Sequence, residues 1–329
     1  MKSLCQNTNC YIKDELLSDE NESLEHIIPN ALGGHLKSKQ LVCGEINTGM
    51  FSKLDAELCK RIEIAKLIKF KRDDGKNQPE IIGTCSDGLK YSVNNENRGK
   101  LLSLKPIEHT DENGKKILKF PLHQKAEIIS ARLKKNPLLK EEDIEIRIEN
   151  DDKLNQLDFQ YGLNIATSTD SFRAVAKIAT NFYILKNGDK KYILDIVDFI
   201  KGGENTSKIN LGYFYPEEFL SFKLGDSEVS HILYLKSCKK EKILYCYVEL
   251  FNCHCYLVVL NSNYAGPEID ETYIWDLVNS KEIDENIFMD ISADTLLQPR
   301  HFYSDAVVKF YAGRLSRLNQ IFGLRLSVK

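Results

Sequence analysis

The chain has no long hydrophobic run. None of its apolar stretches approaches the roughly 20 residues that a membrane-spanning helix needs. Its first 24 residues also lack the apolar segment and the cleavage signal of a secretory leader. From these two absences we expect a cytoplasmic protein with no membrane partner.

The chain also lacks a positive net charge and an even number of cysteines. Its formal net charge is -3, which argues against a protein that coats nucleic acid through bulk positive charge. Its nine cysteines are spread over a long chain, which is more typical of reduced thiols or partial metal sites than of a disulfide framework. Any contact with nucleic acid must therefore be local.

The 329 residues are enough to bury one large core or two to three smaller ones. Two polar stretches, 73–79 and 149–153, interrupt the hydrophobic patterns, and the sequence contains no internal repeat. We therefore expect three regions: an N-terminal domain over 1–72, a middle α+β region over 73–165, and a C-terminal α+β domain over 166–329 that serves in recognition or regulation.

Hydrophobic periodicity predicts an α+β fold. Alternation at every second residue predicts strands within 80–93, 143–148 and 242–260. Spacing of three and four residues predicts helices over 48–70, 171–185 and 304–321. The last helix places Val307, Phe310, Tyr311, Leu315 and Leu318 at helical spacing. We expect a mixed region with an antiparallel sheet, followed by a packed C-terminal helix.

A Glu-His pair lies in an apolar segment near the N-terminus. Glu25 and His26 come just before Pro29, which ends a strand. A carboxylate in such a pair can hold a cation, and the imidazole can take a proton from water. Gly33-Gly34 then lets the backbone turn or approach a phosphate closely. A second apolar segment at 41–43, followed by the helix from 48, completes a strand–strand–helix pattern.

This pattern resembles the HNH endonuclease family over residues 5 to 72. The resemblance rests on Glu25-His26-Ile27-Ile28-Pro29, Gly33-Gly34, Leu41-Val42-Cys43, Asn47 and Leu54-Asp55. It implies an N-terminal ββα-metal domain that hydrolyses phosphodiester bonds in DNA. On this resemblance, His26 would be the general base, and Glu25 and Asn47 would hold one Mg²⁺ or Mn²⁺. Residues 173–179 and 199–203 are loosely similar to the tails of bacterial proteins that carry this nuclease at the N-terminus, and they indicate no chemistry.

Two features depart from the family's pattern. Gln40 stands where the family usually has an asparagine, and it offers the same amide to catalysis on a longer arm. Many relatives also carry four cysteines in two knuckles, whereas here the candidates are Cys5, Cys10 and Cys43, with Ile46 at the fourth position. Three thiolates are one short of a closed structural Zn²⁺ site, and Cys43 also suits a small buried hydrophobe.

Two groups of basic residues are candidates for contact with nucleic acid. His35, Lys37 and Lys39 follow the two glycines, and Lys66, Lys69 and Lys71 belong to a basic stretch near the end of the predicted helix. Both groups are equally consistent with plain solvated residues. RNA as the substrate, and a module that binds nucleic acid or a protein partner without cutting, stay open as alternatives, as does a homo-oligomer. A role in phage defence is the expectation from how such nucleases are typically used.

Overall fold

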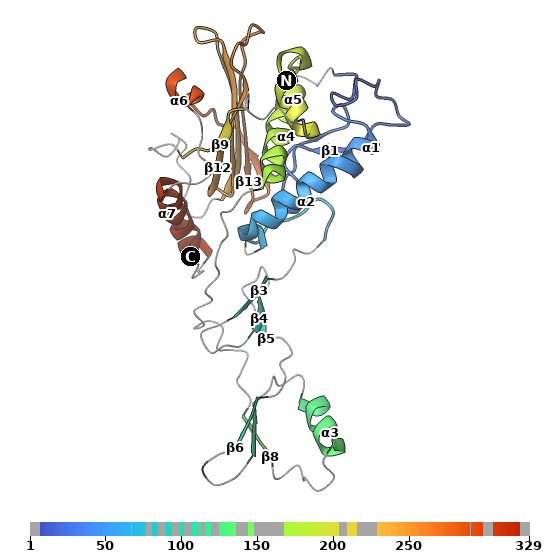
Figure 1. Cartoon of the computed structure of the whole chain (residues 1–329), viewed down its shortest axis with the longest axis vertical. Coiled ribbons are helices and arrows are strands. Elements are labelled where there is room, and N and C mark those ends of the chain that lie inside the picture. The colour runs from blue at the N-terminus through green and yellow to red at the C-terminus, as the bar shows by residue number, and fades with distance from the viewer. Residues whose placement is uncertain are drawn as a thin grey trace. The chain divides into compact units, whose positions relative to one another are not determined.

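The computed structural model divides the chain into two compact units, whose elements are labelled in Figure 1. One unit contains Met1–Asn77 and Leu163–Leu324, and the other contains Gln78–Gly162. The N-terminal and C-terminal parts of the chain therefore fold together, although the middle region separates them in sequence. The structure describes residues 7–66, 68–76, 81–84, 90–93, 99–101, 107–110, 112, 116–119, 125–135, 144–147, 168–203, 209–215, 229–289, 291–298 and 305–322.

The N-terminal part contains the expected small ββα region. β1 (Glu25–His26) pairs antiparallel with β2 (Lys37–Ser38), and a short η1 (Asn30–Leu32) lies between them. α1 (Gly44–Ile46), a π-helical turn η2 (Asn47–Phe51) and α2 (Ser52–Arg61) then follow without a break. The sequence therefore predicts the order of the elements correctly.

Two boundaries in this region differ from the sequence prediction. The second strand is β2 and not 41–43, where Cys43 forms only an isolated bridge with Glu22. The helix ends at Arg61 and not at 70, because Ile62 leaves the helical conformation with φ −89° and ψ 67°. A short η3 (Glu63–Lys66) follows, so that Ile64 and Ile68 are buried without a continuous helix.

A six-stranded antiparallel sheet forms the centre of this unit. Its order is β14-β13-β10-β11-β12-β9, and every neighbouring pair is antiparallel. The strands predicted within 242–260 are confirmed, and a tight turn at 251–253 separates them. The strands are β9 (Leu211–Tyr213), β10 (Ser230–Cys238), β11 (Ile243–Leu250), β12 (His254–Asn261), β13 (Asp270–Asp276) and β14 (Lys281–Ile283).

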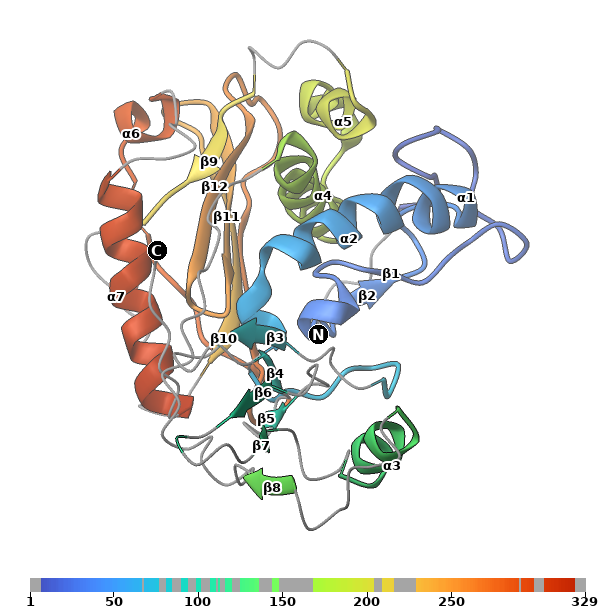
Figure 2. The ribbon, with the colours of Figure 1, turned by 60° about the horizontal axis from the view of Figure 1, so that its bottom comes forward.

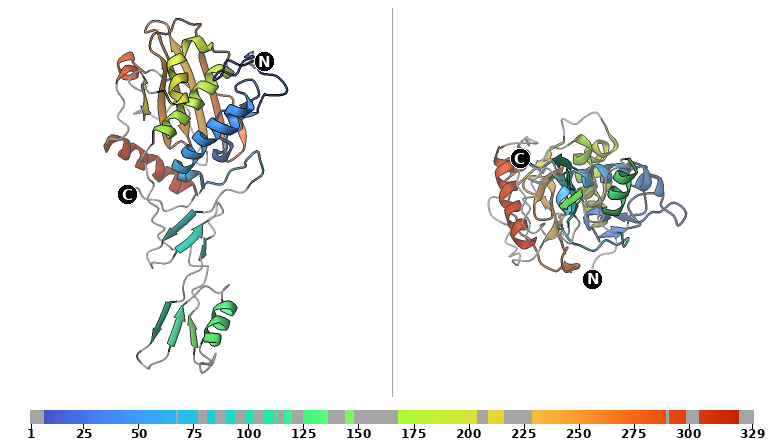
Figure 3. Two further views of the ribbon diagram at one scale, coloured as in Figure 1. Left: turned by 45° about the vertical axis from the view of Figure 1, so that its right-hand side comes forward. Right: turned by 90° about the horizontal axis from the view of Figure 1, so that it is seen from below.

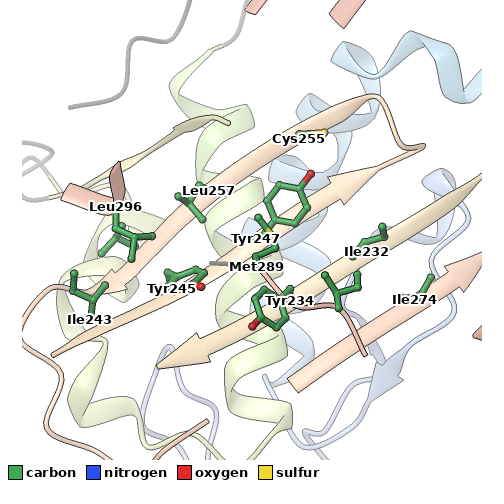
Figure 4. Close-up of a cluster of buried hydrophobic side chains, with 12 residues drawn as sticks. Ile232, Tyr234, Ile243, Tyr245, Tyr247, Cys255, Leu257, Ile274, Met289 and Leu296 are labelled. Atoms are coloured by element: carbon green, nitrogen blue, oxygen red, sulfur yellow. The ribbon is translucent and has the colours of Figure 1, made fainter. Parts of the chain in front are cut away.

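Helices cover both faces of this sheet. α4 (Thr169–Leu185) lies between the sheet and α2, whereas α7 (Asp305–Phe322) lies across the opposite face (Figure 2). Three shorter helical segments, η7 (Lys190–Tyr192), α5 (Leu194–Lys201) and α6 (Ala293–Leu297), complete the unit. Figure 4 shows part of the hydrophobic core on the sheet, where Tyr247 and Leu257 pack beside Met289.

The central helix α4 is buried on all sides. Ser168 starts it with a capping box, in which its side chain accepts from the backbone N–H of Ser171 and the Ser171 side chain accepts in return. Every residue from Phe172 to Ile184 except Arg173 is buried, as expected for a helix enclosed between a sheet and another helix. The buried set includes Lys177 and Asn181, two polar residues that need partners inside the protein.

The C-terminal helix α7 confirms the sequence prediction in position but not in every side chain. Tyr311, Leu315 and Leu318 are buried as expected. Phe310 is instead 39% exposed, and Arg314 is buried with its Nη1 3.6 Å from Glu249 Oε1. A buried carboxylate on the sheet therefore draws a charged residue into the packed face of the helix.

The middle unit has strands and one helix in its described part, drawn in teal and green in Figure 3. β3 (Ile81–Thr84), β4 (Lys90–Val93) and β5 (Gly99–Leu101) form an antiparallel sheet, which confirms strands within 80–93. In a second sheet, β6 (Ile107–Thr110) pairs antiparallel with β7 (Lys116–Lys119), which pairs in parallel with β8 (Ile144–Arg147). The helix is α3 (Lys125–Lys135). In the described parts of both units, no helix is long and apolar enough to cross a membrane.

Candidate active site

Three side chains from the ββα region meet at one carboxylate. His26 Nε2 lies 3.3 Å from Asp73 Oδ2, and Lys37 Nζ lies 2.5 Å from the same oxygen. His35 Nδ1 lies 2.7 Å from the other oxygen, Oδ1. We call these four residues, His26, His35, Lys37 and Asp73, the Asp73 cluster.

The local fold explains why the Asp73 cluster forms. His26 and Lys37 are directly paired across β1 and β2, and side chains opposite each other in an antiparallel pair project to the same face. The backbone N–H of Asp73 donates to Asn30 Oδ1 at 2.9 Å, which fixes the segment after η3 against η1. His35 is held by the carbonyl of Lys71 at 3.1 Å.

The His35 ring also stacks on Trp275 of β13, with 4.2 Å between the ring centroids. Trp275 is the single tryptophan of the chain and belongs to the central sheet. The cluster is therefore positioned from both parts of its unit, because the ββα region supplies the polar groups and the sheet supplies a flat aromatic support.

The electrostatics of the cluster favour a neutral His26. Burial lowers the pKa of His26 below its ordinary value and Lys37 adds to this effect, while Asp73 opposes it. Burial raises the pKa of Asp73, but its hydrogen bonds with Lys37 and His26 outweigh this effect and hold the pKa below its ordinary value. The contact with a carboxylate assigns the tautomer of His26 that carries its proton on Nε2, which leaves Nδ1 as the proton acceptor.

Glu25 faces a different environment. It is 2% exposed, and its Oε1 accepts from Lys177 Nζ at 2.7 Å and from Asn181 Nδ2 at 3.0 Å, both from α4. The same ammonium lies 2.7 Å from Asp55 Oδ1 of α2. Burial raises the pKa of Glu25 above its ordinary value. Burial alone would lower the pKa of Lys177, but the charges of Asp55 and Glu25 outweigh this effect and raise the pKa of Lys177 above its ordinary value.

Asn47, the second predicted metal ligand, has partners of its own. It lies in the π-helical turn η2, and its Nδ2 donates to Ser23 Oγ at 2.9 Å and to the carbonyl of Leu24 at 3.2 Å. These two bonds tie the start of the helical segment to the residues just before β1. In the structure, Asn47 therefore holds the strand that carries Glu25 and His26.

The remaining predicted contact residues lie at the surface or outside the described residues. Gln40 is exposed, and its backbone bonds with Asn7 and Ser38. Lys39 is exposed and forms an ion pair with Glu22. Lys69 and Lys71 are exposed, whereas the side chain of Lys66 lies outside the described residues. The structure therefore brings His35 and Lys37 to His26 and places Lys69 and Lys71 at the surface.

Two of the three candidate zinc ligands lie together. Cys10 and Cys43 are both buried, and burial, followed by a hydrogen bond with the Cys10 thiol, raises the pKa of Cys43. Cys5 lies outside the described residues. Among the residues that the structure describes, no group of three or more His, Cys, Asp or Glu side chains could hold a metal ion.

Three residues at these sites, Asp73, Lys177 and Trp275, are not among those predicted from the sequence. Asp73 belongs to a polar turn that looks like a domain edge, and nothing in that turn points back to β1. Lys177 had a usable signal, because a lone lysine in the otherwise apolar run 174–179 must find a buried partner if the helix is central. Its partners could not be named from sequence, since they lie far away along the chain.

Comparison with known proteins identifies the N-terminal part. Residues 10–63 match the family model of the HNH endonucleases. The chain matches no curated protein and no solved structure. The matched segment contains Glu25, His26 and Asn47 but ends before Asp73, and Lys177 also lies outside it. The family's activity is nuclease cleavage of nucleic acid, and its domains generally bind a divalent metal.

The described residues do not fit a divalent cation at the predicted place. Glu25 already contacts an ammonium and an amide N–H, both through Oε1. The amide oxygen of Asn47 is its metal-binding atom, and the two hydrogen bonds of the amide nitrogen to Ser23 and Leu24 fix the orientation of that amide. An ammonium 2.7 Å from a carboxylate oxygen repels a second cation from the same oxygen. Of the expected pair of ligands for Mg²⁺ or Mn²⁺, Glu25 is thus engaged with a cation of the protein itself.

Proposed function

We propose that the chain is an endonuclease that hydrolyses phosphodiester bonds in DNA at the Asp73 cluster. The observation that carries this proposal is the half-buried His26, which lies inside the segment that matches the HNH endonucleases and contacts Asp73 beyond that segment. A neutral imidazole held by a carboxylate is the usual arrangement of a general base that acts on water.

Each member of the cluster has a role in this proposal. His26 Nδ1 accepts a proton from the attacking water while Nε2–H is held by Asp73, which orients the ring. Lys37 provides an ammonium group for a phosphate, the part of a nucleic acid that carries no sequence information. Both ring nitrogens of His35 already contact Asp73 and the carbonyl of Lys71, so its role is to hold Asp73 in place. DNA is the proposed substrate, and RNA is the enzyme-class alternative, because hydrolytic groups of this kind do not read the sugar.

The direct test is cleavage by the purified full chain. We expect wild type to cut plasmid DNA, and His26→Ala to lower the rate by about 100-fold or more, since a general base contributes about 10² to 10⁴. Lys13→Ala is a matched control, because Lys13 is exposed and pairs with Glu45 away from the cluster. Single-stranded DNA and structured RNA, offered in parallel, decide the substrate. Cleavage by His26→Ala at the wild-type rate would contradict the proposal.

A second candidate function is a module that binds nucleic acid without cutting it. The observation that favours it is the neutralised Glu25, because Lys177 takes the carboxylate that the family's resemblance assigns to a metal. Wild type that retains DNA in a gel-shift assay but leaves it intact with Mg²⁺ or Mn²⁺ would support this module. His26→Ala would then alter binding at most.

A further inference from the structure

A single buried lysine contacts two carboxylates behind β1, Glu25 and Asp55, which we call the acidic pocket. The side chain of Lys177 is 0% exposed, that of Glu25 is 3% exposed, and that of Asp55 is 23% exposed. Glu25 comes from β1 and Asp55 from α2, so the pocket belongs to the ββα region, while the lysine comes from α4. An ammonium in such a place is stable only because carboxylates surround it.

The contacts around the ammonium are specific. Glu25 Oε1 and Asp55 Oδ1 each lie 2.7 Å from Lys177 Nζ, and the Phe51 ring centroid lies 5.1 Å from it. Asn181 donates to the same oxygen of Glu25 and accepts from the hydroxyl of Tyr11 at 2.7 Å. The carboxylate of Glu25 is therefore oriented by two residues of α4, one turn apart.

We propose that Lys177 is an internal cation, which takes the place beside Glu25 and Asp55 that a divalent metal ion would otherwise occupy. Carboxylate oxygens are ligands that Mg²⁺ and Mn²⁺ prefer, and these two lie within reach of one central atom. The tethered ammonium excludes the ion by charge and by volume. The pocket in this chain therefore binds no divalent cation, and removal of the lysine's charge opens it to one.

The experiment measures Mn²⁺ binding by electron paramagnetic resonance on the full chain without substrate. We expect Glu25→Gln to leave Mn²⁺ binding as in wild type, because the wild-type pocket is closed to the ion. Lys177→Met should bind one additional Mn²⁺ per chain and gain thermal stability on its addition, whereas Lys177→Met combined with Glu25→Gln should do neither. Lys186→Met is the matched control, since Lys186 directly follows α4 but pairs with Glu271 outside the pocket.

Two results would overturn the proposal. The first is wild type that binds one Mn²⁺ and loses it in Glu25→Gln, because Glu25 would then be a metal ligand despite Lys177. The second is Lys177→Met that folds and binds no additional ion. If Lys177→Met does not fold, the comparison of wild type with Glu25→Gln still decides. Neither measurement involves cleavage, so a failure here leaves the proposed nuclease activity standing, and a failure of that activity leaves the internal cation standing.

Discussion

At the scale of single residues, Asp73 decides how the candidate base is held. Its two oxygens contact three side chains, and its charge raises the pKa of His26 against burial and Lys37. A carboxylate in this position acts through the histidine and is therefore a positioning residue. Its effect should appear in the pH dependence of the reaction as well as in the rate.

Asp73→Asn should move the acid limb of the pH–rate profile to lower pH. Asparagine removes the negative charge that raises the pKa of His26, so the ring stays neutral at still lower pH than in wild type. The rate at neutral pH should fall by about 10-fold. This is a smaller decrease than the about 10²- to 10⁴-fold decrease expected when the general base itself is removed. Asp74→Asn is the control, because Asp74 pairs with Arg72 instead. An unshifted acid limb in Asp73→Asn would show that the two side chains do not interact during turnover.

Residues also show where prediction from sequence stops. His26 and Asn47 could be found because each belongs to a contiguous pattern of strand, glycines and helix. Asp73 could not, because the pattern around it consists of turn residues that many loops share. Gln40 belongs to the predicted site only through its position in the family's pattern. Such a pattern does not give the direction in which a side chain points.

At the scale of elements, the turn between β1 and β2 depends on its two glycines. Gly33 has φ +83°, which few residues other than glycine adopt, and a Cβ on Gly34 would lie 1.9 Å from the carbonyl oxygen of Ile28. The close approach expected at these glycines therefore occurs against the chain's own backbone at Ile28. It brings the following residues, His35 and Lys37, back to His26.

Gly34→Ala should destabilise the fold and lower cleavage together. The added methyl group must push Ile28 and the turn apart, which we expect to cost about 1–3 kcal/mol in the free energy of unfolding, as overpacking does elsewhere. Gly49→Ala in η2 is the control, since a Cβ there meets nothing within 4 Å. Urea denaturation of both variants gives the comparison. A Gly34→Ala protein as stable as Gly49→Ala would refute the tight turn.

Two lysines in the segment after η3 lead to a separate prediction about DNA binding. Lys69 and Lys71 are exposed next to the Asp73 cluster in sequence. If they contact phosphates, Lys69→Glu combined with Lys71→Glu should weaken binding and reduce the salt slope of log K by about 0.9 for each phosphate that is no longer neutralised. Lys239→Glu with Lys240→Glu, in the exposed turn after β10, should leave the slope unchanged. An unchanged slope in the first pair would mean that these lysines are only solvated.

Helices and strands are predicted best where hydrophobic residues recur at one constant spacing over the whole element. The central helix and the strands within 242–260 follow such periods, and the structure confirms them. The helix from 48 was predicted about nine residues too long, since buried residues continue at helical spacing after Ile62 although the backbone changes to η3. Periodicity reports which side chains are buried, and it does not report how the backbone connects them.

At the scale of the whole molecule, His231 joins the sheet to the ββα region. It lies in β10, is fully buried, and its Nε2 lies 2.8 Å from the carbonyl of Leu32 in η1. Its Nδ1 accepts from the backbone N–H of Phe251 at 3.2 Å. Both ring nitrogens are satisfied only in the neutral form, and burial lowers the pKa of His231 to about 4.

Stability should fall as the pH drops from about 6.5 toward 4. In this window the unfolded chain binds a proton at His231 and the folded chain does not, so each pH unit costs about 1.4 kcal/mol for this group. Urea denaturation at pH 7, 6 and 5 measures the effect. His231→Gln should be less stable at pH 7 but should show a smaller dependence on pH. An equal pH slope in wild type and His231→Gln would exclude His231 as the source.

Contacts between segments on either side of the middle unit could not be predicted from local patterns. The sequence places Glu25 and Lys177 152 positions apart, with a separate unit between them. Their attraction depends on α2 packing against α4, and this depends in turn on the sheet that supports α4. Only the full three-dimensional fold shows which of the many carboxylates a buried lysine reaches.

The insertion of residues 78–162 has a consequence for biosynthesis. A ribosome that adds about 5–20 residues per second needs about 8–30 s to pass from Glu25 to Lys177, which lie 152 positions apart. During that interval the nascent ββα region has neither α4 against α2 nor an ammonium beside Glu25. Translation thus delivers the segment that matches the HNH endonucleases first, and a truncated product of stalled synthesis carries this segment without Lys177.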